Sequence, residues 1–231
     1  RREVAGFPGL PLSPSPSALL LTGATNDRFE DRLTEAIESI LARARAGSSV
    51  LVTASGLAGV HVASLLSALD DELDVPPVTL VGHAAKLYET LGYAHESVTT
   101  VPTYSEPTGL VEPGGVTIAG PEVPVESSSK RLFDLLADDP GATLVQLTSG
   151  GVSPVESAGC TVEQYRYSNH PTEETVDELV ETMTPRQVVV THQTGAGLSR
   201  YKDRYDSFVW ATTDHDEYTL YEDGTWVAPP W

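Results

Sequence analysis

The sequence has one cysteine, three lysines and no long apolar run. Cys160 alone cannot form an internal disulfide bond, and no Cys-x-x-Cys pair is present to clip a zinc ion, which favours a reducing cytoplasm. No purely apolar run is longer than that of Ala18 to Leu21, whereas a membrane-spanning helix needs about 20 residues. No charged leader followed by an apolar segment precedes that run. We therefore expect a cytoplasmic protein without a membrane span or a signal peptide.

The charge is strongly unbalanced. The 231 residues include 33 Asp and Glu against 14 Lys and Arg, which gives a formal net charge of −19. Such acidity with so few lysines suggests a halophilic protein, because molar salt screens like charges to a Debye length of about 3 Å. An ordinary acidic protein that avoids nucleic acid is the alternative. At moderate salt this surface repels phosphate, so RNA binding needs a local site or a basic partner.

Strand and helix patterns alternate along most of the chain. Hydrophobic residues make up 40% of the sequence and fall in short runs, which excludes disorder as the default state. Buried strands are predicted at 18–22, 50–53, 78–81, 116–119 and 143–147. Helical spacing is predicted at 29–47, 60–69, 86–91 and 127–138, the last of these capped by Ser127, Ser128 or Ser129. This alternation predicts a parallel α/β sheet.

Three further segments have a distinct character. The opening Arg1 to Ser17 is rich in Pro, Gly and Ser, which predicts a loop that enters a domain from elsewhere. Thr99 to Pro113 holds three prolines and two weak strand signals, which indicates a loop-rich connection. The tail from Phe208 is aromatic and β-branched, and Asp223-Gly224 predicts the turn of a β-hairpin.

The first candidate site residue is His170. The segment 167–174 is typical of a strand end, a short loop and a helix start, in which Thr172 is the predicted N-cap. An apolar stripe follows at Val176, Leu179, Val180 and Met183. His170 therefore precedes a helix N-terminus, a position suited to anions. The structural alternative is a histidine that caps the helix or bonds a neighbouring carbonyl.

The second candidate is His192. A strand of β-branched residues that begins at Pro185 runs directly into His192 and then into Gly195. Because the carboxyl ends of parallel strands carry ligands, His192 is placed where a metal ligand or a general acid would lie. A polar residue that merely closes the strand is the alternative.

The order of these motifs resembles the β-CASP branch of the metallo-β-lactamase fold, whose members are mostly zinc-dependent RNA and DNA nucleases. The family's Ser-x-His before a helix is similar to 168–170, and its Val-His-Gly is similar to Thr191-His192 with Gly195 displaced. The resemblance implies that His192 is a zinc ligand and that His170 lies near the scissile phosphate.

The region that opens the family's cap is similar to residues 49–60. Gly59 matches the family's glycine, and Val60 replaces its arginine. Two departures matter more. The zinc motif His-x-His-x-Asp-His is absent from these residues, and Thr22 stands where the family has an acidic residue that orients the ligand shell.

The resemblance leaves two interpretations. The chain is either the C-terminal half of a longer protein whose first half carries the zinc ligands, or a degenerate, non-catalytic relative. The absence of an initiator Met and the loop-like start favour the first interpretation. Since the zinc motif is absent, we expect this chain to be inactive by itself.

We therefore expect an α/β fold, with a metallo-β-lactamase-like core half and an inserted β-CASP-like parallel-sheet cap. The expected segments are a core segment at 1–47, the cap at 48–157, and a return to the core with a hairpin at 158–231. The expected function is that of the C-terminal half of a zinc-dependent ribonuclease, similar to an mRNA 3′-end processing factor. RNA and the missing half are its expected partners, and the oligomeric state, including a homodimer, is left open.

Two other functional classes stay open. One is a non-catalytic β-CASP-like subunit that binds RNA or a protein partner, which Thr22 favours. The other is a nucleotide-binding α/β domain, for which no phosphate fingerprint is found.

Several weaker candidates complete the sequence interpretation. We expect His61 and His83 to satisfy local hydrogen bonds. His215, in Asp214-His215-Asp216, could bind a cation, although a solvated turn is favoured. The turn at 148–151 follows a strand but lacks the lysine of a P-loop. The basic and aromatic residues at 200–205, which include Arg200, Tyr201, Lys202, Arg204 and Tyr205, could hold RNA, but the aspartates among them favour a surface helix or a strand edge.

Overall fold

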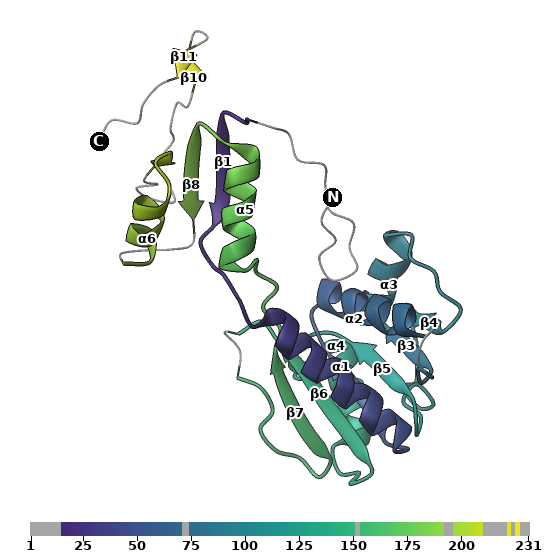
Figure 1. Cartoon of the computed structure of the whole chain (residues 1–231). Helices are drawn as coiled ribbons and strands as arrows, with labels where there is room; N and C mark the ends of the chain where they lie inside the picture. Colours follow the sequence, from purple (N-terminus) through teal and green to yellow (C-terminus); the bar gives the residue numbers. More distant parts are fainter. Residues whose placement is uncertain are drawn as a thin grey trace. The chain divides into compact units, whose positions relative to one another are not determined.

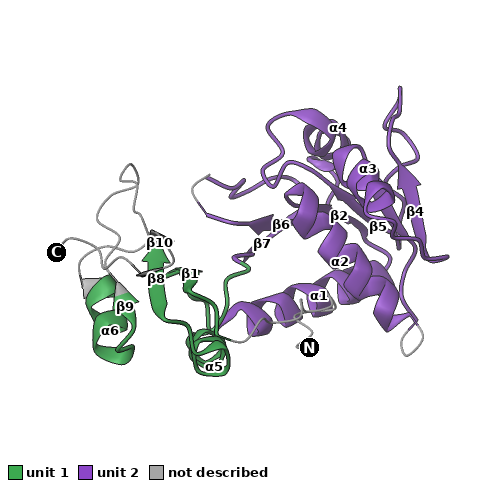
Figure 2. Cartoon of the chain, turned by 90° about the horizontal axis from the view of Figure 1, so that it is seen from above, with its two compact units in different colours: residues 1–2, 9–27, 169–231 green, residues 3–8, 28–168 purple. Residues whose placement is uncertain are grey.

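The computed structural model describes residues 15–70, 74–150, 153–191, 196–209, 221–222 and 225–226 (Figure 1). The described residues form two compact units (Figure 2). The large unit comprises residues 28–168. The small unit comprises the described residues up to Asp27 and those from Asn169 onward, so the large unit is an insertion between two parts of the small one.

The large unit is built on a six-stranded parallel sheet with the order β4-β3-β5-β2-β6-β7. Its strands are β2 (Ser49–Thr53), β3 (Val78–Val81), β4 (Val98–Val101), β5 (Val116–Ala119), β6 (Ala142–Thr148) and β7 (Thr161–Arg166). Its helices are α1 (Phe29–Arg45), α2 (Gly56–Leu69), α3 (His83–Thr90) and α4 (Ser127–Leu136). The first three helices pack on one face of the sheet, and α4 packs on the other. Because both faces are covered, β2 and β5 are buried along their whole length.

The small unit has a three-stranded parallel sheet with the order β1-β8-β9. Its elements are β1 (Ala18–Thr22), α5 (Glu173–Met183), β8 (Gln187–Thr191), α6 (Ala196–Arg204) and β9 (Phe208–Val209). The two helices share one apolar cluster with alternate residues of the strands. Farther along the chain, β10 (Tyr221–Glu222) and β11 (Thr225–Trp226) pair in antiparallel register on either side of 223–224, which confirms the predicted hairpin.

The α/β class and most predicted elements are confirmed. The strands at 18–22, 78–81 and 116–119 have the predicted bounds. Two helices begin earlier than predicted, α2 at Gly56 and α3 at His83. One strand, β4, overlaps the start of the segment expected to be loop-rich, because pairing with β3 satisfies its backbone groups.

One capping prediction is wrong. Glu126, rather than one of the serines, occupies the N-cap position of α4, and its side chain makes no capping hydrogen bond. Ser127 is already the first helical residue and has a positive φ of 57°.

The boundaries of the two compact units differ from the domain boundaries expected from the sequence, which were 47/48 and 157/158. Their boundaries lie at 27/28 and 168/169. The reason is tertiary packing: α1 covers the large sheet through Ala36, Ile37 and Ile40, and β7 pairs with β6. No helix within the described ranges is long and apolar enough to span a bilayer.

Candidate functional site

The carboxyl ends of β1 and β8 are bound to each other in the small unit. The two strands pair in parallel with Thr22 opposite Thr191. The amide of Gly23 donates a hydrogen bond to the Thr191 carbonyl at 2.7 Å, and the Thr191 hydroxyl donates to the Leu21 carbonyl at 3.1 Å. His192 follows Thr191 directly in the sequence, but it lies outside the described residues.

The start of α5 is held to the segment that leaves β1. The predicted N-cap is confirmed, because the Thr172 hydroxyl accepts a hydrogen bond from the Thr175 amide at 3.0 Å. The Asp27 carboxylate accepts a hydrogen bond from the Glu173 amide at 2.9 Å. This contact satisfies a second backbone amide that has no partner within the helix. The Asn26 amide donates to the Pro171 carbonyl at 3.0 Å. His170 is half-buried and comes two residues before this cap.

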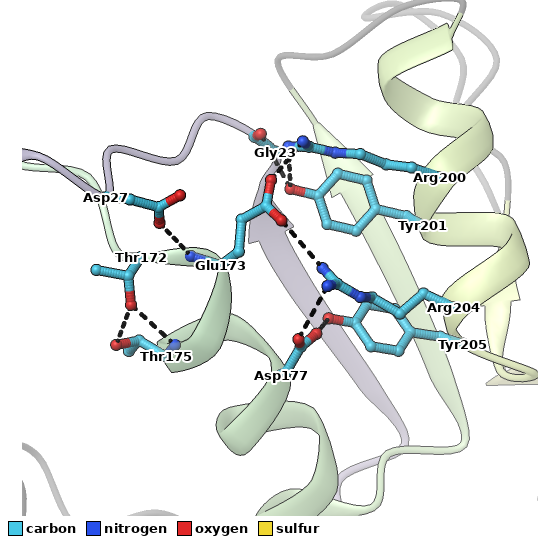
Figure 3. A network of polar contacts seen from close by, with 10 residues as sticks. All are labelled: Gly23, Asp27, Thr172, Glu173, Thr175, Asp177, Arg200, Tyr201, Arg204 and Tyr205. Atoms are coloured by element: carbon cyan, nitrogen blue, oxygen red, sulfur yellow. Dashed lines mark hydrogen bonds and ion pairs between the residues drawn. The ribbon is translucent and has the colours of Figure 1, made fainter.

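A polar network joins α6 to α5 and to the end of β1 (Figure 3). The Tyr201 hydroxyl donates to the Gly23 carbonyl and accepts from Nη2 of Arg200. Arg200 also pairs with Glu173 on α5. The hydrogen bond to Tyr201 is the main cause that raises the pKa of the Arg200 guanidinium, which stays charged.

The second half of this network lies one turn further along each helix. Arg204 lies 3.5 Å from Glu173 and 3.3 Å from Asp177. The Tyr205 hydroxyl donates to the Asp177 carboxylate. Burial, followed by that hydrogen bond, raises the pKa of Tyr205.

This arrangement decides between the two interpretations of residues 200–205. Tyr201 is 1% exposed and Tyr205 is 8% exposed, so neither ring is open for stacking with a base. The guanidinium groups of Arg200 and Arg204 are paired with carboxylates of α5. The segment is a helix whose tyrosines face the core and whose arginines hold two helices together, and the RNA-stacking alternative is wrong.

The described residues do not by themselves make a zinc site. Within the part of the chain that the structure describes, no three His, Cys, Asp or Glu side chains come together as a metal-binding group. Thr22, where the resemblance to the β-CASP family implies an acidic residue, has a hydroxyl that accepts a long 3.4 Å hydrogen bond from the Ala24 amide. A zinc site requires at least three protein ligands, so His192 would need ligands from other residues.

A carboxylate that sequence reasoning missed lies at the carboxyl edge of the large sheet. Glu122 follows β5, and its carboxylate accepts hydrogen bonds from both the amide and the hydroxyl of Ser149, which follows β6. The Thr53 hydroxyl at the end of β2 donates to the Glu122 carbonyl at 2.7 Å. Ser149 belongs to the turn at 148–151, and two hydrogen-bond donors of this turn, its amide and its hydroxyl, are therefore bound to a carboxylate of the protein itself.

The histidines of the large unit have separate environments. His61 is buried, and its Nδ1 shares a hydrogen bond with the hydroxyl of Tyr167, 106 residues away, so its partner is not local. Phe29 meets the Tyr167 ring edge to face at 5.2 Å, and burial raises the pKa of Tyr167. His83 is exposed and lies close to the start of α2, where a Cβ on Gly56 would come within 2.9 Å of its ring. His215 lies outside the described residues.

No protein-family model matches this chain, and no curated protein sequence matches it significantly.

Proposed function

We propose that this chain is the C-terminal part of a β-CASP-type, zinc-dependent ribonuclease, similar to an mRNA 3′-end processing factor. The observation that carries the proposal is the pairing of β1 with β8. It brings Thr22 beside Thr191, the residue before His192, while the segment after β1 is bonded to the cap that follows His170. The residue before His192 and the residue after His170 are therefore both bonded to the end of β1 or to the segment that follows it.

The division of the chain supports the same proposal. The all-parallel large unit is inserted between β1 and α5 of the small unit. In the proposal, residues 28–168 form the β-CASP-like cap and the small unit is part of the metallo-β-lactamase-like core. The acidic surface leaves RNA contacts to this local site or to a basic partner, because a net charge of −19 repels phosphate elsewhere.

The two histidines have different roles in the proposed hydrolysis. His192 holds zinc together with ligands from a preceding part of the polypeptide. His170 exchanges a proton at the phosphate or the leaving-group oxygen, the role of a positioned general acid or base. The capped start of α5 fixes the segment that carries His170.

The test uses the longer polypeptide with His170→Ala, His192→Ala and His95→Ala. His95 is the control, because its ring bonds Ser97 within a turn of the large unit. His192→Ala should abolish RNA hydrolysis and lower the zinc content. His170→Ala should lower turnover about 10²–10⁴-fold with zinc retained, as expected for a positioned acid. Parental rates and zinc contents in both site variants would contradict the proposal.

A non-catalytic, β-CASP-like subunit that binds RNA or a protein partner is the second candidate. The observation in its favour is Thr22, a neutral residue at the end of β1 where the family has a carboxylate. For this candidate, the longer polypeptide should bind RNA or a protein partner without cleaving RNA. The variant Thr22→Asp then tests whether RNA cleavage can be restored, since a carboxylate at this position can orient the zinc ligands. Cleavage by the parent polypeptide would exclude this candidate.

A further inference from the structure

The polar network of the small unit contains a closed ring at the carboxyl end of β1 (Figure 3). Nη1 of Arg200 donates to the Glu173 carboxylate, and the Glu173 amide donates to the Asp27 carboxylate at 2.9 Å. Nη2 of Arg200 donates to the Tyr201 hydroxyl at 3.2 Å, and this hydroxyl donates to the Gly23 carbonyl at 3.1 Å. Gly23 and Asp27 lie four residues apart in the segment that leaves β1, so the chain itself closes the ring.

Arg200 occupies the place in this ring where two helices are joined. Its partner Glu173 is in the first turn of α5, whereas Arg200 and Tyr201 belong to α6. The guanidinium carbon lies 5.0 Å from the centre of the Tyr201 ring. A planar guanidinium with a rigid fork of N–H donors can bond two acceptors in a fixed geometry, which a single ammonium group does not reproduce. Arg200 therefore links the start of α5 to the end of β1 through Tyr201.

The start of α5 determines where His170 lies. The backbone of a residue before a proline is restricted to extended conformations, so Pro171 limits the freedom of His170. The Pro171 carbonyl in turn accepts a hydrogen bond from the Asn26 amide at 3.0 Å. His170 is thus joined to the start of α5 by a short, stiff link, and a shift of that start moves the imidazole with it.

Arg204 provides a comparison within the same helix. Its guanidinium lies 3.5 Å from Glu173 and 3.3 Å from Asp177, and neither contact involves the end of β1. The two arginine side chains are similarly exposed, 38% for Arg204 and 41% for Arg200. Ion pairs with this exposure contribute little to stability. A functional difference between the two arginines therefore has to come from the ring.

We propose that Arg200 is a positioning residue for His170, because it closes the ring that fixes the start of α5 against the segment that leaves β1. The inference rests on the proposed function, in which His170 is the general acid or base. It adds to that function a residue that acts through Glu173 and not on the substrate.

Kinetics of the longer polypeptide test the inference with Arg200→Gln and Arg204→Gln, which remove the same charge from the same helix. Arg200→Gln should lower kcat for RNA hydrolysis about 10²-fold, because a displacement of about 1 Å at a reacting group has an effect of this size. Its KM and zinc content should stay at the parental values. Arg204→Gln should keep the parental kcat. Equal kcat values in the two variants would overturn the inference.

The imidazole signals of His170 give a measurement that does not depend on cleavage. NMR spectra of the 231-residue chain identify these signals by their loss in His170→Ala. Arg200→Gln should shift or broaden them, and Arg204→Gln should leave them in place. Unchanged signals in Arg200→Gln would overturn the inference whether or not RNA is cleaved.

The two measurements separate this inference from the proposed function. A parent polypeptide that does not cleave RNA contradicts the proposed catalysis, and the NMR comparison then still decides whether Arg200 positions His170. If Arg200→Gln disturbs folding, Arg200→Lys is the second variant. It keeps the charge opposite Glu173 but lacks the planar fork, so it should displace the same signals, and parental signals in this variant would likewise overturn the inference.

Discussion

The hydroxyl of Tyr201 donates a 3.1 Å hydrogen bond to the carbonyl of Gly23, 178 residues earlier in the chain. Gly23 is the first residue after β1, and its own amide is bonded to Thr191 at the end of β8. The end of β1 is thus joined to β8 by its amide and to α6 by its carbonyl. These two contacts hold both elements that flank residues 192–195.

Loss of this contact should destabilise the protein. Tyr201→Phe keeps the ring but removes the hydroxyl, so a buried carbonyl is left without its partner, at an expected cost of about 1–3 kcal/mol in the free energy of unfolding. Urea denaturation measures the change. Tyr104→Phe is the control, because within the described residues its buried hydroxyl has no hydrogen-bond partner and its removal should be neutral or stabilising. Equal losses in the two variants would contradict the prediction.

Glu163 should contribute to stability in a pH-dependent way. Burial raises the pKa of this carboxyl, but hydrogen bonds from Ser39, Arg43 and Tyr165 lower it, and the net shift is downward from 4.5. A lowered folded-state pKa contributes stability that is present above the unfolded value and is lost as the pH falls through the folded value.

Glu163→Gln should therefore be less stable than the parent at neutral pH, and the difference should shrink as the pH falls below 4.5. Urea titrations at neutral and acidic pH check this expectation. Glu35→Gln is the control, since it removes an exposed ion pair with Arg32 that should contribute little at either pH. A stability difference that stays constant with pH would count against the role of Glu163.

The buried pair of His61 and Tyr167 should show energetic coupling. Tyr167→Phe leaves the imidazole Nδ1 of His61 without its partner, and His61→Leu leaves the phenol without one, each at about 1–3 kcal/mol. The double variant should lose less than the sum of the two, with a coupling energy of about 0.5–3 kcal/mol. A double-mutant cycle in urea measures it. Additive losses would show that the two side chains act independently.

The 231-residue chain by itself should not hold two zinc ions. One candidate ligand, His192, is too few for a site that needs at least three protein ligands. Metal analysis after dialysis checks the expectation. Two stoichiometric zinc ions that survive dialysis would show that the chain contains a complete site.

Folding should depend on salt. A net charge of −19 on a compact protein is self-repulsive until counterions screen it, so the melting temperature should rise steeply from dilute buffer to molar potassium chloride. Thermal unfolding followed by circular dichroism gives the series. A melting temperature that does not change over this range would remove the interpretation as a halophilic protein.

Local patterns predicted much of the fold. The strands at 78–81 and 116–119 were predictable because strands inside covered parallel sheets consist of near-continuous apolar runs. The strand at 18–22 was predictable from its short apolar run, although Leu20 is exposed. The start of α5 was predictable because its cap is a bond between Thr172 and a residue three positions later. The position of His170 just before that cap was predictable for the same reason.

Long-range contacts decided the rest. Nothing in the apolar runs indicates that β5 lies between β3 and β2, or that α1 and β7 belong to the large unit, since every buried strand has the same pattern whatever its neighbours are. Tyr201 and Tyr205 lie four residues apart on α6, a spacing that also suits a surface for stacking with bases. Only the fold shows that both rings are buried in the core. The sequence by itself determined the elements and their local caps. The tertiary structure determined the partners, because the energy of a buried hydrogen bond depends on which groups the fold brings together and not on their separation along the chain.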